Sequence, residues 1–112
     1  MYKRGGIYAV NLGPAGAAPP ETCPCLIISN NISNEFSLVV TVIPLVFTNL
    51  EKIYDFESLL PAAKTGLGRD AKISSHILFT IDKTTVVGER LGFVSKSLMA
   101  RVEKALRLQL AL

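Results

Sequence analysis

Residues 23–31 read Cys-Pro-Cys-Leu-Ile-Ile-Ser-Asn-Asn. The apolar run at 26–28 predicts a buried strand, and the serine and two asparagines after it are turn residues that end it. Pro24 cannot donate a backbone hydrogen bond to a neighbouring strand, so it belongs at the strand's entry, where a loop passes into a sheet. We therefore predict a strand over 25–29, entered from a loop over 13–22 that is rich in glycine, alanine and proline.

Strand patterns of this kind occur along most of the chain. The segment 38–45 is apolar apart from Thr41 and rich in β-branched residues, which is typical of a central strand buried on both faces. We also predict strands over 7–12, 52–59 and 89–94, with one bent strand or two short ones over 71–82. Turns or loops are predicted over 30–37 and 62–68.

The pattern changes to a helical period after Ser95, which is a suitable N-cap residue. Leu98, Val102, Ala105 and Leu106 recur at helical spacing, and neither glycine nor proline interrupts the run. We predict an amphipathic C-terminal helix whose apolar stripe packs on the core. Strands at short spacing followed by one helix predict a mostly β (α+β) domain, although this pattern alone does not choose between a barrel and an open sheet.

The composition predicts one packed domain over residues 1–112. A chain of 112 residues buries roughly two-thirds of its unfolded surface, and 49% of these residues are hydrophobic. Only 19% are charged, so much of the outer surface is neutral or apolar, as it is at subunit interfaces. No apolar run is long enough to span a membrane, and the N-terminus leaves no room for a signal peptide, so we expect a cytoplasmic protein.

The net charge of +3 is unevenly distributed. From Lys83 onward the basic residues outnumber the glutamates, which is compatible with binding RNA or an acidic peptide, and equally with solvated faces of a helix and a hairpin. Cys23 and Cys25 do not form a disulfide framework, and a zinc site would need more ligands than His76, the only histidine, can add. We expect two ordinary thiols, no metal and no cofactor.

Three segments resemble, in this order, the PemK/MazF family of toxins from toxin–antitoxin systems. They are 23–31, the preceding Arg-Gly-Gly-Ile-Tyr-Ala-Val-Asn-Leu-Gly-Pro at 4–14, and Thr-Ile-Asp-Lys at 80–83. Glu-Arg-Leu-Gly at 89–92 and the terminal helix extend the resemblance over nearly the whole chain. It implies an SH3-like barrel of twisted antiparallel strands and a homodimer. It also implies metal-independent cleavage of single-stranded mRNA and an antitoxin partner with an acidic tail.

The resemblance indicates where an RNA-cleaving site lies. The family usually has an arginine before the proline of its second strand, which stabilises the phosphate, and that position is Cys23 here. A thiol offers only a weak hydrogen bond in place of a guanidinium. A threonine or serine after the central strand helps to position the phosphate. Counted without gaps this position is Val46, and a two-residue slip would make it Thr48.

Ahead of Thr80, the family commonly has acidic or amide groups and a second arginine, where this chain has His76, Ile77 and Phe79. Histidine titrates near neutrality and can serve as base or acid in RNA cleavage, although a lone histidine is more often structural. Four residues are candidate RNA contacts: Arg4 and Lys83 lie in the resembling segments, and Ser74 and Ser75, beside His76, carry hydroxyls that can donate to phosphate, although serines at a strand edge rarely do so.

Two functions fit these residues. In the first, the chain is a working endoribonuclease toxin in which His76, Thr48 and nearby hydroxyls compensate for the missing arginine. In the second, it is a catalytically weakened or inactive relative that still dimerises and binds an antitoxin tail or RNA. The apolar replacements concentrate in the site while the scaffold motifs stay, which favours the second. A gyrase-poisoning toxin of the same superfamily is a third class, and the C-terminal residues lack its signature.

Overall fold

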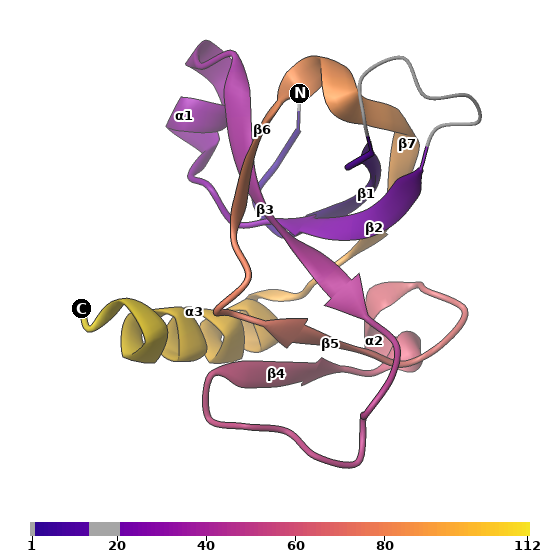
Figure 1. Ribbon diagram of the computed structural model, residues 1–112, viewed down its shortest axis with the longest axis vertical. Helices are drawn as coiled ribbons and strands as arrows, with labels where there is room; N and C mark the ends of the chain where they lie inside the picture. Colours follow the sequence, from indigo (N-terminus) through magenta and orange to yellow (C-terminus); the bar gives the residue numbers. More distant parts are fainter. Residues whose placement is uncertain (1, 14–20) are drawn as a thin grey trace.

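The computed structural model describes residues 2–13 and 21–112, which form a twisted antiparallel sheet followed by a long helix (Figure 1). The predicted fold class, mostly β (α+β) with twisted antiparallel strands and a C-terminal helix, is confirmed. In chain order the elements are β1 (Gly6–Asn11), β2 (Thr22–Ile27), α1 (Asn31–Phe36), β3 (Val39–Val46), β4 (Glu57–Leu60), α2 (Ala62–Thr65), β5 (Ala71–Ser74), β6 (Phe79–Asp82), η1 (Lys83–Thr85), β7 (Val86–Phe93) and α3 (Lys96–Leu110).

Strand β3 is the centre of the sheet. One edge pairs with β2 through residues 42–44, and the other pairs with β6 through 39–42 and then with β5 at Leu45 and Val46. The strand order is β4-β5-β3-β2-β1-β7, with β6 added at β3. In Figure 1, β3 runs from the upper group of strands to β4 and β5 below, so it joins the two parts of the sheet.

Two apolar cores lie on opposite faces of the central strands. The barrel core has Ile81 of β6 and Val86 of β7 packed against it, and its buried members are Tyr8, Val10, Cys25, Ile27, Val40 and Val42. The helix core lies between the sheet and α3, and its buried members are Ile7, Leu26, Ile43, Leu45, Leu60, Ala71, Ile73, Val94, Leu98, Met99 and Val102. Because β3 supplies residues to both cores, it is buried on both faces, as its apolar sequence predicts.

Helix α3 begins where the sequence predicts. The Ser95 hydroxyl accepts a hydrogen bond from the backbone N–H of Leu98 at 3.3 Å, which is the geometry of an N-cap. Val102 and Ala105 are buried, so the apolar stripe does pack on the core. Within residues 2–13 and 21–112, no helix combines the length and apolar character that a membrane crossing requires.

The turn predicted over 30–37 contains helix α1. Asn30 accepts a hydrogen bond from the backbone N–H of Ser33 at 2.8 Å, and the buried Asn34 amide donates to the Ser29 carbonyl at 2.9 Å. The asparagines that favour a turn therefore cap and anchor one short helix, which uses the same side-chain to backbone hydrogen bonds.

The strand predicted over 52–59 begins later, as β4. The first half of that segment is a loop because the ammonium group of Lys72 donates to the backbone carbonyls of Asn49 and Lys52, at 3.0 and 3.3 Å. The Lys72 side chain, which comes from β5, thus supplies these carbonyls with the hydrogen bonds that a neighbouring strand would otherwise donate. This interaction is set by the tertiary structure, and no local pattern predicts it.

The remaining boundaries differ by smaller amounts. Segment 71–82 divides into β5 and β6, one of the two alternatives that the sequence leaves open. The loop predicted over 62–68 contains α2, which ends at Gly66 with φ of 80°, a left-handed conformation that favours glycine. The last strand starts earlier than 89, at Val86. Most of the loop predicted over 13–22 lies outside the described residues.

Candidate functional site

Cys23 lies on β2, opposite Val10 of β1, and its half-buried thiol packs against the barrel core. Strand β2 begins at Thr22, earlier than predicted. Pro24 is tolerated inside it because the pairing with β3 starts only at Cys25, so that edge needs no donor from the proline. The position that the resemblance links to phosphate binding therefore carries a thiol packed against the core.

Cys25 is fully buried in the barrel core. Burial raises the pKa of its thiol to about 12, and the neighbouring Cys23 thiol acts in the same direction. Both cysteines are free, and Cys25 is unreactive at neutral pH because the thiolate is the nucleophilic form. Among residues 2–13 and 21–112, no group of three His, Cys, Asp or Glu side chains is placed to hold a metal ion.

Val46 is the last residue of β3 and lies beside β5. The pairing of β2 with β3 ends at Cys25 and Pro44, and Cys23 and Val46 each lie two residues beyond that pair. The two positions that the resemblance connects with the phosphate thus come to the same end of the β2–β3 pair. Thr48 follows beyond the end of the strand, where it is exposed.

His76 lies in the link between β5 and β6, where β3 changes its partner strand. Its imidazole is exposed and stands edge-on to the Phe56 ring, with 4.7 Å between ring centroids. Ser74 and Ser75 precede it but are buried. The Ser74 hydroxyl donates to Glu57 at 2.5 Å, and the Ser75 hydroxyl has no hydrogen-bond partner among the described residues.

Arg4 connects the N-terminal segment to α3. Its Nη1 lies 2.7 Å from Oε1 of Glu103, and its Nε donates to the Ile28 carbonyl at 2.9 Å. Lys83 lies in η1, where its ammonium group donates to the Glu35 carbonyl of α1 at 3.4 Å. The structure therefore places these two cations beside α3 and α1, in contacts that the sequence did not indicate.

A buried ion pair supports the loop between β3 and β4. The Lys72 ammonium group lies 3.3 Å from the Glu57 carboxylate, and the two side chains are 8% and 4% exposed. Burial by itself raises the pKa of Glu57. Hydrogen bonds from Ser74, the Tyr54 backbone and Lys72, together with the lysine's charge, outweigh this effect and hold the pKa below its ordinary value. Glu57 is therefore a charged carboxylate with three donors around it.

Three aromatic rings and a cation line up next to this ion pair. Tyr54 stacks on Phe56 with 5.2 Å between centroids and 6° between planes, and the Lys52 ammonium lies 4.9 Å from the Tyr54 centroid. We call Lys52, Tyr54, Phe56 and His76 the aromatic row. Sequence reasoning missed Tyr54 and Phe56. The available signal was their alternate spacing with Lys52 within the segment predicted as a strand, which places three residues on one face.

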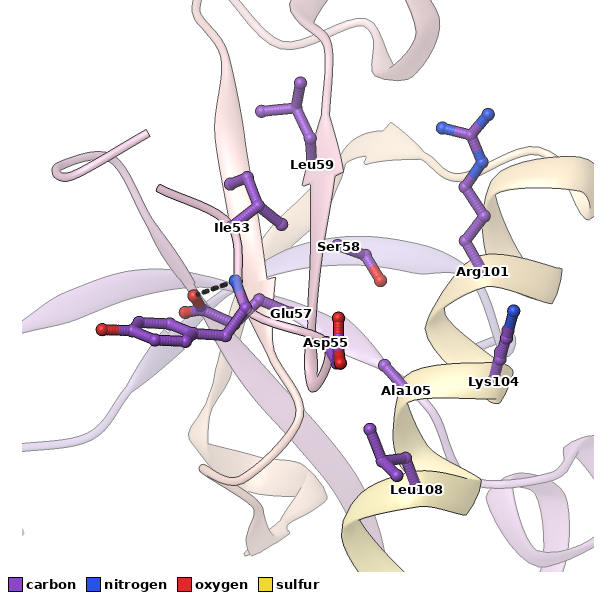
Figure 2. Close-up of a pocket in the computed structure, with 10 residues that line it drawn as sticks. Ile53, Asp55, Glu57, Ser58, Leu59, Arg101, Lys104, Ala105 and Leu108 are labelled. Carbon is purple, nitrogen blue, oxygen red and sulfur yellow. Dashed lines mark hydrogen bonds between the residues drawn. The ribbon is translucent and has the colours of Figure 1, made fainter. Parts of the chain in front are cut away.

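A groove of about 670 Å³ lies between β4 and α3 (Figure 2). In Figure 2, Ser58 and Asp55 lie on one side, and Arg101 and Lys104 extend from α3 on the other. Strand β4 ends the strand order and pairs with β5 alone among the described strands, so one of its edges is open. We call this feature the basic groove. Its lining residues are Ile53, Tyr54, Asp55, Glu57, Ser58, Leu59, Arg101, Lys104, Ala105 and Leu108.

Comparison with known families and sequences relates the whole chain to one group of proteins. A family model described as "PemK-like, MazF-like toxin of type II toxin-antitoxin system" matches residues 3–110. The chain is similar to Endoribonuclease MazF9 of Mycobacterium tuberculosis, with 34% identity over 118 residues that cover 100% of this chain and 98% of the relative. It is also 29% identical to Endoribonuclease EndoA of Bacillus subtilis, over 100% of this chain and 97% of the relative.

Solved structures share the fold. An endoribonuclease from a mycobacterial species, solved in complex with its cognate antitoxin, superposes with a TM-score of 0.82 at 23% identity, covering 100% of this chain and 97% of that chain. The crystal structure of MazF from Deinococcus radiodurans superposes with a TM-score of 0.78 at 22% identity, covering 100% and 98%. The order of strands and the C-terminal helix described above are therefore those of this fold.

We expect Glu57→Gln to lower the free energy of unfolding at neutral pH by about 3–5 kcal/mol, because Lys72 then keeps a buried charge without its partner. In the native chain the pKa of Glu57 lies below its ordinary value of 4.5. Its ionisation therefore stabilises the fold above that pH, and the stabilisation is lost as the pH falls through the folded pKa.

Urea unfolding measured from neutral to acidic pH tests this expectation. The native chain should lose stability on acidification more steeply than Glu57→Gln. Glu51→Gln, which removes an exposed carboxylate of the same loop, serves as the control and should follow the native curve. An identical pH dependence in the native chain and Glu57→Gln would contradict the role of the ion pair.

Proposed function

Because the chain belongs to the PemK-like, MazF-like toxin family of type II toxin–antitoxin systems, we propose that it is a toxin whose cleavage of single-stranded mRNA is weakened or lost. The curated relatives named above are endoribonucleases, which supports the reaction class. Cys23 is the observation that supports weakened cleavage, because it stands at the arginine position and packs against the barrel core.

The chemistry explains why this position matters. Metal-independent cleavage needs a base for the 2′-hydroxyl, an acid for the leaving oxygen, and donors that stabilise the charge building on the phosphorane. Loss of one preorganised donor costs about a hundred- to a thousandfold in rate. The half-buried Cys23 thiol, paired with Val10 on β1, supplies no such donor, and Val46 at the same end of the β2–β3 pair supplies no hydroxyl.

His76 and Thr48 are the residues we propose for any remaining catalysis. The imidazole of His76 is exposed, and an imidazole can accept or donate a proton in RNA cleavage. Thr48 is exposed just past the end of β3, where a hydroxyl can donate to a phosphate. Cys23 lies at the arginine position and is the least competent of the three.

We propose Arg4, Ser74, Ser75 and Lys83 as RNA contacts of unequal accessibility. Lys83 is half-buried, and its ammonium group must leave the Glu35 carbonyl to reach a phosphate. Arg4 keeps 30% of its side chain exposed while paired with Glu103. The hydroxyls of Ser74 and Ser75 are buried, so they reach RNA only if the end of β5 opens.

The alternative is an inactive relative that acts as an antitoxin- or RNA-binding dimer. The exposed apolar side chains of Ile77 and Phe79, at positions where the resemblance expects an amide and an arginine, favour this alternative. Exposed apolar residues are common at binding surfaces and contribute nothing to the stabilisation of a phosphorane.

A nuclease assay on a fluorescent single-stranded RNA, in the presence of a chelator, separates the two functions. We expect the double change Cys23→Arg with Val46→Thr to raise the cleavage rate by about a hundredfold or more, since it restores a cation and a hydroxyl. Cys23→Ala with Val46→Ala is the matched control and should gain nothing. His76→Ala should abolish residual cleavage. Cleavage by the native chain as fast as by the double variant would contradict the proposed weakening.

A second copy of the chain is the first partner we propose. Ile32, Phe36 and Leu38, on α1 and just before β3, are 75%, 79% and 81% exposed. Three adjoining apolar side chains so fully exposed are typical of a surface that is covered by a partner. A homodimer through this face is therefore our proposal for the assembly.

Light scattering during size-exclusion chromatography tests the homodimer. The native chain should have the mass of two chains, and Phe36→Lys with Leu38→Lys should have the mass of one, because two charges cannot be buried in an apolar contact. Leu112→Lys changes an equally exposed leucine outside this face and should remain dimeric. A dimeric double variant would contradict this interface.

An antitoxin with an acidic tail is the second partner we propose, and the basic groove is its site. Arg101 and Lys104 provide positive charge, Ile53 and Leu108 provide apolar contact, and the open edge of β4 offers backbone hydrogen bonds to an added strand. Asp55 is the one exposed acidic residue of the lining, so the groove favours an acidic peptide.

Binding of a synthetic peptide with alternating acidic and apolar residues tests this site. Arg101→Glu with Lys104→Glu should weaken binding at least about tenfold, since both charges that face the peptide are reversed. Lys96→Glu with Arg107→Glu makes the same change in net charge on α3 outside the groove and should weaken it less. Equal losses in both variants would show general electrostatic attraction and contradict a docking site in the groove.

A further inference from the structure

The aromatic row lies on the protein surface, outside both apolar cores. Tyr54 is 47% exposed although its ring lies parallel to Phe56, and neither residue belongs to the barrel core or the helix core. His76 ends the row at Phe56, and the Lys52 ammonium lies over Tyr54 at the other end. Stacked rings left partly in water, with a cation beside them, are a usual platform for a further flat group.

The backbone beneath the row is held in place before any ligand arrives. The Tyr54 N–H donates to Oε1 of Glu57 at 3.2 Å, and the Lys72 ammonium donates to the Lys52 and Asn49 carbonyls. The loop that carries two of the rings is thus anchored to the buried ion pair. A platform ordered in advance loses less conformational entropy on binding, which raises the affinity that stacking can give.

We propose that the aromatic row is a stacking site for one unpaired nucleobase of a bound RNA, with Tyr54 as the platform. This proposal rests on the proposed function, since it assigns a subsite to the same RNA. The base stacks at Tyr54, and Lys52 moves from the ring to the adjacent phosphate. His76 ends the row at Phe56, so the Tyr54 and Phe56 rings lie between the stacked base and the imidazole.

The charges around the row favour a base over other ligands. Glu51 and Asp55 flank Lys52 and Tyr54 in sequence and are both exposed, so the row has no excess of positive charge and holds a ligand mainly through its rings. A nucleobase is neutral and has a π-face that stacks whatever its identity, so this site gives affinity without strong sequence preference. One phosphate beside the base needs one cation, and Lys52 supplies it.

The experiment uses short 2′-O-methyl oligoribonucleotides, which the 2′-hydroxyl mechanism cannot cleave, and measures their dissociation constants by fluorescence anisotropy. Loss of a stacked base is worth about a five- to hundredfold change in affinity, so Tyr54→Leu should weaken binding by that factor. Tyr54→Phe keeps the ring and should bind within about twofold of the native chain. Leu91→Ala removes an equally exposed apolar side chain from β7, outside the aromatic row, and should bind as the native chain does.

A scan with abasic oligonucleotides gives a second readout that a general loss of structure does not imitate. In the native chain, one abasic position should weaken binding, and in Tyr54→Leu the same position should have little further effect. Unchanged binding by Tyr54→Leu would overturn the stacking site while leaving the proposed RNA function standing. If the native chain binds none of the oligonucleotides, both the stacking site and the RNA function are wrong.

Discussion

Burial of β3 on both faces is the constraint on which the rest of the structure depends. Val40 and Val42 enter the barrel core, and Ile43 and Leu45 enter the helix core. A shift of one residue in register would exchange these sets between the two cores, so the pairing with β2, β5 and β6 is fixed. That register pairs Cys25 with Pro44 and so brings Cys23 and Val46 to the same end of the β2–β3 pair.

The buried ion pair of Glu57 and Lys72 is the second constraint, and it shapes the surface beside the site. It holds the loop after β3 in a conformation that exposes Tyr54. Tyr54 belongs to the aromatic row and also lines the basic groove. The proposed RNA and antitoxin surfaces therefore share one residue, so a peptide in the groove would meet the platform that the base uses.

The candidate site was only partly predictable because several of its contacts join residues that are far apart in sequence. The resemblance gave the positions of Cys23, Val46 and His76, because motif order is a property of the chain itself. The Arg4 contact with Glu103 spans 99 residues, and the Ser74 contact with Glu57 spans 17. Long-range partners of this kind decide whether a polar side chain faces water or is already satisfied inside.

By itself, the sequence determined the mostly β class, the two-sided burial of β3, and the N-cap of α3 at Ser95, because each depends on local periodicity or on a local hydrogen bond. Only the tertiary structure decided that the segment before β4 is a loop and that the stretch before β3 contains α1. It also brought the aromatic row together, since Phe56 and His76 meet only when β4 pairs with β5. Short segments have weak intrinsic preferences, so contacts from elsewhere in the chain settle their conformation.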